Sequence, residues 1–317
     1  MNNTILYALT VLIWGSTWYA IEFQLGAVAP EVSLVYRYAA AAALLFAWCL
    51  FRGLKLRFAI RDHAHFMLLG LLLFGVNYVV AYHAQVHITS ALTAIAFSTM
   101  VWMNILNARL FFGARSGRRV LIGASLGVIG ILVLFIPRIG QLSLDDSMVL
   151  GSLLAIASAA LASLGNMVSQ AAQRASLPVL QSNAWGMFYG TLINATIALA
   201  SGKEFLFDAS PAYIGSLAYL TVFGSIVAFG AYLTLLGRIG AHRAGYAMVL
   251  FPVVALVLSA AFEGLSIDPP TAVGCCLVLA GNACVLSRFE RSRRLPRLSH
   301  ALARFVARLR PVSERPC

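Results

Sequence analysis

The chain has 317 residues, of which 61% are hydrophobic and 11% are charged, and its formal net charge is +12. Soluble domains carry about 25% charged residues, so this composition excludes an ordinary soluble globular protein. Apolar runs of about 20 residues recur along the sequence, and each is long enough to cross about 30 Å of hydrocarbon.

Ten such runs predict an all-α polytopic membrane protein with ten transmembrane helices. The first run lacks a basic start and a small-residue cleavage site, so it is interpreted as a helix and not as a cleavable signal. Only short connections remain between the runs, which leaves no room for a bulky soluble domain. The runs lie near residues 4–22, 32–51, 65–83, 88–112, 120–136, 149–171, 180–200, 213–236, 244–263 and 271–288.

Basic residues are distributed unevenly between the two sides that these helices define. Alternate connections and the C-terminal tail carry 19 Lys and Arg residues, whereas the opposite connections carry 2, Arg138 and Lys203. By the positive-inside rule, both termini are expected in the cytoplasm. The positive charge therefore indicates topology, and nucleic acid is not an expected partner. The tail after Arg288 is expected to be either a basic amphipathic helix on anionic lipid or a disordered segment.

A polar connection at residues 137–147 separates the first five runs from the last five. Phe74-Gly75 in the third run recurs as Phe223-Gly224 in the eighth, and the glycine spacing of the fifth run recurs in the tenth. Because five is odd, the second half must enter the membrane from the opposite side, which predicts two inverted five-helix repeats around a central cavity. The expected parts are a first repeat (1–136), a periplasmic connection (137–147), a second repeat (148–288) and a basic cytoplasmic tail (289–317).

Aromatic and small polar residues within the runs predict the walls of that cavity. Buried polar groups in lipid face a bundle interior or a water-filled space, although interfacial aromatics and helix-to-helix hydrogen bonds explain any single residue equally well. Together they indicate an aromatic-walled, uncharged cavity for an amphipathic small molecule. The candidates are Trp14, Thr17, Trp18, Tyr78, Tyr82, Thr99, Trp102, Asn166, Trp185 and Tyr246.

Arg37 is a charged residue just inside the outer end of the second run, where a charge needs a partner. Glu22 and Glu31 are the candidate partners, and an ion pair that joins the first two helices is slightly favoured. The alternatives for Arg37 are a gate or a docking point for a substrate carboxylate. Glu263, which ends the ninth run, is a second acidic candidate for gating or proton sensing.

Motifs for metal, nucleotide or covalent chemistry are weak in this sequence. His83 and His87 are spaced i, i+4, but they lack the acidic residue and third ligand of a zinc site. They are interpreted as part of a short outside turn. No P-loop or nucleophile elbow is present, so neither catalytic residues, nor a metal, nor a cofactor is expected, and the protein is not expected to be an enzyme.

Three segments resemble the drug/metabolite transporter superfamily, in its branch with paired EamA domains. They are WGSTWYAIEFQLGAVAPEVSLVYRY (14–38), FSTMVWMNILNARLFFG (97–113) and VLFPVVALVLSAAFEGL (249–265). The resemblance covers residues 4 to 288 and implies ten helices, two inverted repeats, a central cavity and a place in the bacterial inner membrane. Members export amino acids, metabolites or toxic compounds, and aromatic amino acid exporters of the YddG type form one branch. The Pro that is usual in the fourth helix is replaced here by Thr99.

The favoured function is export of aromatic and other neutral amino acids, such as Phe, Met and Thr, or of related small metabolites, by alternating access. A multidrug exporter of cationic compounds is the alternative within transporters, and a passive channel is a further one. An intramembrane lipid-modifying enzyme is the alternative from a different class. The expected partners are a small-molecule substrate and membrane lipid, and the expected state is a monomer or a weak dimer.

Overall fold

The computed structural model describes residues 1–88, 93, 96–139, 146–262 and 269–286, and within these residues it consists of helices and their connections, without strands. Two of the segments, η1 and η2, are π-helical. In chain order the elements are α1 (Asn3–Glu22), α2 (Pro30–Phe51), α3 (Ile60–Leu69), η1 (Gly70–Gly75), α4 (Val76–His87), α6 (Met100–Phe112), α7 (Arg118–Ile139), α8 (Asp146–Arg174), α9 (Val179–Ala200), α10 (Pro211–Tyr219), η2 (Leu220–Val227), α11 (Ala228–Ile239), α12 (Ala241–Ala244), α13 (Ala247–Phe262) and α14 (Pro269–Leu286).

These elements form ten spans, because α3, η1 and α4 are continuous, as are α10, η2 and α11. Among the described residues, five helices are long and apolar enough to cross a membrane by themselves: Asn3–Glu22, Pro30–Phe51, Ile60–His87, Val149–Arg174 and Pro211–Ile239. The other spans are α6, α7, α9, α13 and α14. The predicted all-α class with ten membrane helices is confirmed.

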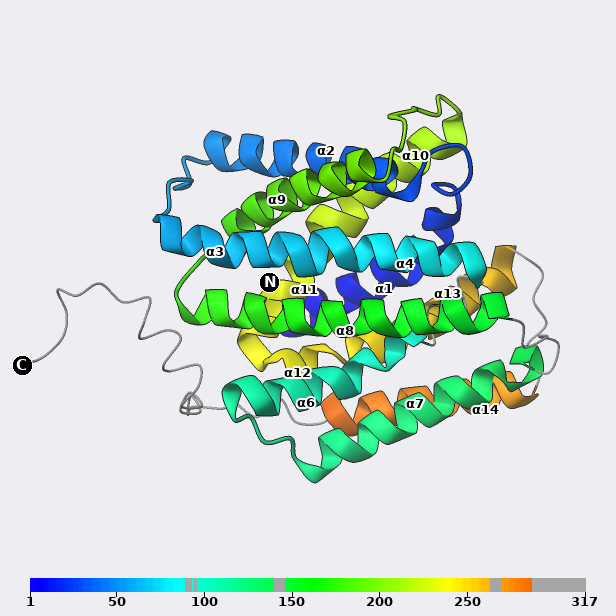
Figure 1. Ribbon diagram of the computed structural model, residues 1–317. Helices are drawn as coiled ribbons and strands as arrows, with labels where there is room; N and C mark the ends of the chain where they lie inside the picture. Colours follow the sequence, from blue (N-terminus) through cyan, green and yellow to red (C-terminus); the bar gives the residue numbers. More distant parts are fainter. Residues whose placement is uncertain (89–92, 94–95, 140–145, 263–268, 287–317) are drawn as a thin grey trace, which may run out of the picture.

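The ten spans pack with the symmetry of an inverted repeat. The fifth span α7 lies against the tenth, α14, at one edge of the bundle, and the second span α2 lies against the seventh, α9, at the other edge (Figure 1). Between these edges, α1 packs on α11 and α13, while its counterpart α8 packs on α4 and α6. The main contacts between spans thus have counterparts with the two halves exchanged.

Glycines at the α7–α14 crossing repeat this symmetry in atomic detail. A Cβ on Gly130 would lie 2.8 Å from the carbonyl oxygen of Gly274, and a Cβ on Gly281 would lie 2.7 Å from that of Gly123. Small residues allow helix backbones to approach closely in a membrane. The spacing that the fifth and tenth runs share in the sequence therefore serves one reciprocal helix contact.

The third and eighth spans each contain a π-helical segment that includes the repeated Phe-Gly pair. Segment η1 contains Phe74-Gly75 and segment η2 contains Phe223-Gly224. Short π-helical segments inside α-helices are frequent at functional sites because they redirect side chains and free backbone carbonyls. Side chains from other spans bind two of these carbonyls. Asn194 donates to the oxygen of Phe74 at 3.0 Å, and Trp14 donates to that of Gly224 at 3.2 Å.

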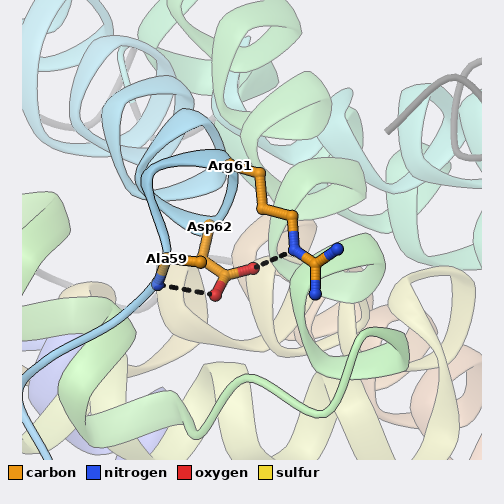
Figure 2. Close-up of polar contacts among 3 residues, drawn as sticks. All are labelled: Ala59, Arg61 and Asp62. Atoms are coloured by element: carbon orange, nitrogen blue, oxygen red, sulfur yellow. Dashed lines mark hydrogen bonds and ion pairs between the residues drawn. The ribbon is translucent and has the colours of Figure 1, made fainter. Parts of the chain in front are cut away.

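Helix α3 begins with a side-chain cap at the connection after α2. The Asp62 carboxylate accepts a hydrogen bond from the backbone N–H of Ala59 at 3.2 Å and lies 4.0 Å from Nε of Arg61 (Figure 2). The cap satisfies one of the N–H groups that a helix leaves free at its start. Since the Arg61 side chain is exposed, the ion pair itself adds little stability.

Candidate functional site

A cavity lies between the two halves of the bundle, lined from α1, α2, η1–α4, α6, α8, α11 and α13. The cavity has a volume of about 50 Å³. Its wall is mainly aromatic, and the rings are those of Trp14, Trp18, Tyr78, Phe97, Phe229, Tyr232 and Phe251. The cavity therefore offers flat apolar surfaces in a small volume.

Two tryptophans of α1 organise the aromatic wall. The Trp14 ring lies 4.9 Å from Phe229, edge to face, and 4.9 Å from Tyr232. One turn further along, Trp18 stacks on Phe251 at 5.8 Å. Such pairs stabilise by about 0.5–1.5 kcal/mol beyond the burial of their area. Helix α1 thus joins two spans of the second half through its cavity face.

The small residues between these tryptophans bring α1 close to its neighbours. A Cβ on Gly15 would lie 2.6 Å from the side chain of Val254 and 3.1 Å from the carbonyl oxygen of Phe251. The hydroxyl groups of Ser16 and Tyr219 are 2.6 Å apart and share a hydrogen bond. Thr17 faces the cavity, and its hydroxyl donates to the carbonyl oxygen of Trp14 at 3.0 Å. The first span is therefore built for contact with α13 and the eighth span.

Arg37 is buried at one end of the cavity, with 1% of its surface exposed. Its Nε donates to the hydroxyl of Ser225 at 2.8 Å, and its Nη1 donates to the hydroxyl of Tyr82 at 3.3 Å. The guanidinium carbon lies 4.8 Å from the centre of the Tyr78 ring and 5.3 Å from that of Tyr38. Stacking on aromatic faces and two hydrogen bonds hold the guanidinium plane in one orientation.

The π-helical segment η2 sets the position of the Arg37 partner. Ser225 donates to the carbonyl oxygen of Leu220 at 3.0 Å and accepts from Arg37 with the same oxygen. Gly224 leaves space beside it, since a Cβ there would lie 3.1 Å from the Thr17 methyl group and 3.3 Å from Nη2 of Arg37. The glycine of the repeated Phe-Gly pair therefore leaves room for the Arg37 side chain beside η2.

The ion pair of Arg37 with Glu22 or Glu31, which the sequence slightly favoured, is absent from the described residues. Their ion pairs are Arg61 with Asp62 and His83 with Glu31, the latter at 2.6 Å. Glu31 lies in the first turn of α2, and its carboxylate contacts His83 of α4 instead of Arg37. Glu22 is exposed at the end of α1. Glu263 lies outside the described residues.

Five of the ten predicted cavity residues line this cavity: Trp14, Thr17, Trp18, Tyr78 and Asn166. Asn166 donates to Oδ1 of Asn104 at 3.2 Å and to the hydroxyl of Tyr232 at 3.0 Å. It thereby ties the sixth span to the fourth and the eighth, which gives it a structural role as well as a place at the cavity.

The other five predicted residues lie away from the lining, and each has another place. The Tyr82 hydroxyl accepts a hydrogen bond from Nη1 of Arg37, and the Thr99 hydroxyl donates to the carbonyl oxygen of Ala96. Trp102 is 38% exposed on α6. Trp185 packs on His63 and donates to the carbonyl oxygen of Leu56 at 3.2 Å. The hydroxyl of the buried Tyr246 donates to the carbonyl oxygen of Val120.

Several lining residues were not among the sequence candidates, notably Phe97, Phe229, Tyr232 and Phe251. Phe97 and Met100 supply the wall of the fourth span where Trp102 was expected. Phe229 and Tyr232 are aromatic residues at i, i+3 in the eighth span, a spacing that places them on one helix face. This spacing could have identified Phe229 and Tyr232 as cavity residues from the sequence.

The paired histidines have separate partners. His83 binds Glu31, and Nδ1 of His87 lies 3.0 Å from the Ser147 hydroxyl. Among the described residues there is no group of three or more His, Cys, Asp or Glu side chains that could hold a metal ion.

His242, in the short helix α12 between the eighth and ninth spans, predicts a pH dependence of stability. Burial, followed by the adjacent charge of Arg243, lowers the pKa of His242 from 6.5 to about 4. The unfolded chain therefore binds more protons between these values, so the stabilisation is complete above pH 6.5 and is lost as the pH falls toward 4. Thermal unfolding in detergent should show a lower melting temperature across this window. His242→Gln should flatten the decline, and an unchanged decline in that variant would contradict the assignment.

Two inverted five-helix repeats with an aromatic cavity between them define a class of protein, the membrane transporters in which two halves enclose a central site. The sequence model of the EamA-like transporter family matches the chain twice, over residues 2–136 and 149–287. The chain belongs to this family, as its resemblance to the drug/metabolite transporter superfamily predicted.

Relatives of known sequence and structure agree with this assignment. The chain is 29% identical over 263 residues to YedA of Escherichia coli strain K12, described as an uncharacterized inner membrane transporter, and the match covers 82% of each chain. It is 23% identical over 253 residues to the uncharacterized transporter YoaV of Bacillus subtilis strain 168, covering 77% of this chain and 83% of that protein. A solved crystal structure shares the fold with a TM-score of 0.74 at 20% identity, over 89% of this chain and 95% of the other.

Proposed function

We propose that this transporter exports small amphipathic carboxylates across the bacterial inner membrane, a class that includes aromatic and other large neutral amino acids. The observation that carries the proposal is the pairing of a buried arginine with an aromatic wall. Arg37 supplies a fixed cation for a carboxylate, and Trp14 and Phe229 supply flat surfaces for an apolar side chain. Binding sites for small molecules combine these features, a mostly apolar wall and a few polar groups that set orientation.

Alternating access is the mechanism that the architecture supports. The cavity takes residues from α1 and α4 in the first half and from α8, α11 and α13 in the second. Rocking of one half against the other would therefore open it to one side of the membrane and then to the other. In our proposal both termini are cytoplasmic, as the basic residues of the connections indicate.

The two alternative functions have less support in the geometry. A cationic drug would meet Arg37 as a like charge, and the lining contains no acidic side chain among the described residues. Like charges in a low-dielectric site repel strongly. An intramembrane enzyme would need a catalytic cluster, and the titratable groups that line the described cavity are Arg37 and the hydroxyls of Tyr78 and Tyr232.

The experiment that tests the proposed function is uptake of radiolabelled phenylalanine, methionine and threonine into proteoliposomes. We expect saturable uptake of phenylalanine that protein-free liposomes do not show. Unlabelled substrate inside the vesicles should accelerate it, because a carrier exchanges faster than it returns empty, and this separates a carrier from a channel. Absence of saturable uptake for all three amino acids and for 3-phenylpropanoate would overturn the carboxylate assignment.

A further inference from the structure

Arg37 has more hydrogen-bonding capacity than the protein uses. A guanidinium group carries five N–H donors and no acceptor, and two of them are used, Nε by Ser225 and Nη1 by Tyr82. No acceptor is recorded for Nη2 among the described residues, and the side chain lines the cavity. Nη2 and the second N–H group of Nη1 form one edge of the guanidinium plane. Because two adjacent nitrogens of a guanidinium match the two oxygens of a carboxylate, this edge is suited to an anionic ligand.

Within the part of the chain that the structure describes, no carboxylate is paired with the positive charge of Arg37. The lining of the described cavity contains no Asp or Glu. The nearest acidic residue on the same helix is Glu31, which is six residues or about 9 Å away along the axis and is already bound to His83. Tyr38, Tyr78 and Tyr82 surround the guanidinium with rings and a hydroxyl instead. The empty site therefore carries a net charge of about +1 in a low-dielectric environment.

We propose that the transported substrate is an aromatic monoanion, a carboxylate without an ammonium group, in preference to a zwitterionic amino acid. This inference rests on the proposed function and specifies its substrate. A monoanion on Arg37 makes the loaded site neutral. A zwitterion satisfies the arginine equally well, but it adds an ammonium ion that finds no carboxylate in the lining, and burial of an uncompensated charge is strongly unfavourable.

The geometry separates the two parts of such a ligand. Arg37 binds the eighth span at Ser225, and Tyr232 lies seven residues further along the same span, about 10 Å away. The rings of Trp14 and Phe229 lie in between, since Trp14 contacts Gly224, Phe229 and Tyr232. A carboxylate at Arg37 would therefore place an attached aromatic ring against these two side chains.

The charge of the substrate determines how export is driven. A monoanion that leaves the cell moves one negative charge outward, and an interior-negative membrane potential favours that movement about fiftyfold per 100 mV. Such export needs no coupled proton and no acidic residue inside the spans. Export of a zwitterion moves no net charge and is indifferent to the potential.

The test compares three ligands that share the phenylethyl group: 3-phenylpropanoate, phenylalanine and 2-phenylethylamine. Titration calorimetry on the purified wild-type protein should give a dissociation constant for 3-phenylpropanoate at least about tenfold lower than for phenylalanine, with 2-phenylethylamine weakest. On a solid-supported membrane, 3-phenylpropanoate should produce a transport current, and phenylalanine should produce none. Leakage of the uncharged acid through lipid carries no current and does not interfere.

Arg37→Gln provides the matched variant, because glutamine keeps hydrogen-bonding groups and removes the charge. It should bind 3-phenylpropanoate at least about tenfold more weakly and bind the neutral 3-phenylpropanamide at least as well as the wild type does. Equal or tighter binding of phenylalanine by the wild type would overturn the monoanion proposal and leave the proposed function standing. Binding of neither carboxylate would overturn both. The wild-type comparison decides the matter even if the variant does not fold.

Discussion

Replacement of Trp14 by alanine is expected to lower the rate of transport at subsaturating substrate at least about tenfold. The ring contacts Phe229 and Tyr232, and its Nε1 binds the carbonyl oxygen of Gly224 in the π-helical segment. In the proposed function the ring also contacts the substrate, and truncation removes that aromatic contact, about 0.5–1.5 kcal/mol, together with the apolar surface that the ring covers. A tenfold loss corresponds to about 1.4 kcal/mol.

Trp102→Ala is the matched control, because it removes the same side chain from the exposed face of α6. We expect it to retain most of the transport activity when uptake is normalised to the amount of folded protein. Trp14→Phe should be intermediate, since it keeps a ring and loses the N–H donor. Equal losses in the Trp14→Ala and Trp102→Ala variants would show that the aromatic wall described here is not the substrate site.

The second large effect is expected at the α7–α14 crossing, where Gly281→Ala should destabilise the protein by about 1–3 kcal/mol. The added Cβ would lie 2.7 Å from the carbonyl oxygen of Gly123 and 2.9 Å from the backbone nitrogen of Gly127. Backbone atoms cannot rotate away as a side chain can, so the two helices must separate. The melting temperature in detergent, followed by size-exclusion chromatography after heating, measures the effect.

Gly230 provides the control for this substitution, because it lies within α11 and a Cβ there would meet nothing within 4 Å. Alanine has a higher helix propensity than glycine by about 1 kcal/mol, so Gly230→Ala should leave the melting temperature unchanged or raise it. If both variants melt alike, the close approach of α7 and α14 contributes little to stability.

Features that depend on length, hydropathy and local spacing could be predicted from the sequence. Ten apolar runs implied ten spans, because the thickness of the bilayer sets the length of a membrane helix. The cavity face of α1 was also predictable, since Trp14, Thr17 and Trp18 follow helical spacing. The glycine spacing shared by the fifth and tenth runs indicated a repeat, and the odd number of runs in each half indicated that the repeat is inverted.

The cavity residues of α6 could not be predicted, because its large apolar and aromatic side chains occur on all sides of the helix. A soluble helix shows its buried face by the polarity of the opposite one, but lipid is as apolar as a protein core and removes that contrast. Trp102 was therefore expected at the cavity, whereas the structure places Phe97 and Met100 there. Only the packing of α6 against α8 and α12 decides its rotation.

The sequence by itself determined the class of the protein, the number of its spans and the presence of one arginine inside a span, where a charge needs a partner. Tertiary structure alone decided what that arginine meets. Glu31 is closer to Arg37 along α2 than any other acid, but its carboxylate binds His83 across the helix pair. The partners of Arg37 come from the third and eighth spans, Tyr82 and Ser225, far away in the chain. Because those contacts depend on how the two halves pack, the uncompensated charge at the cavity is a property of the fold.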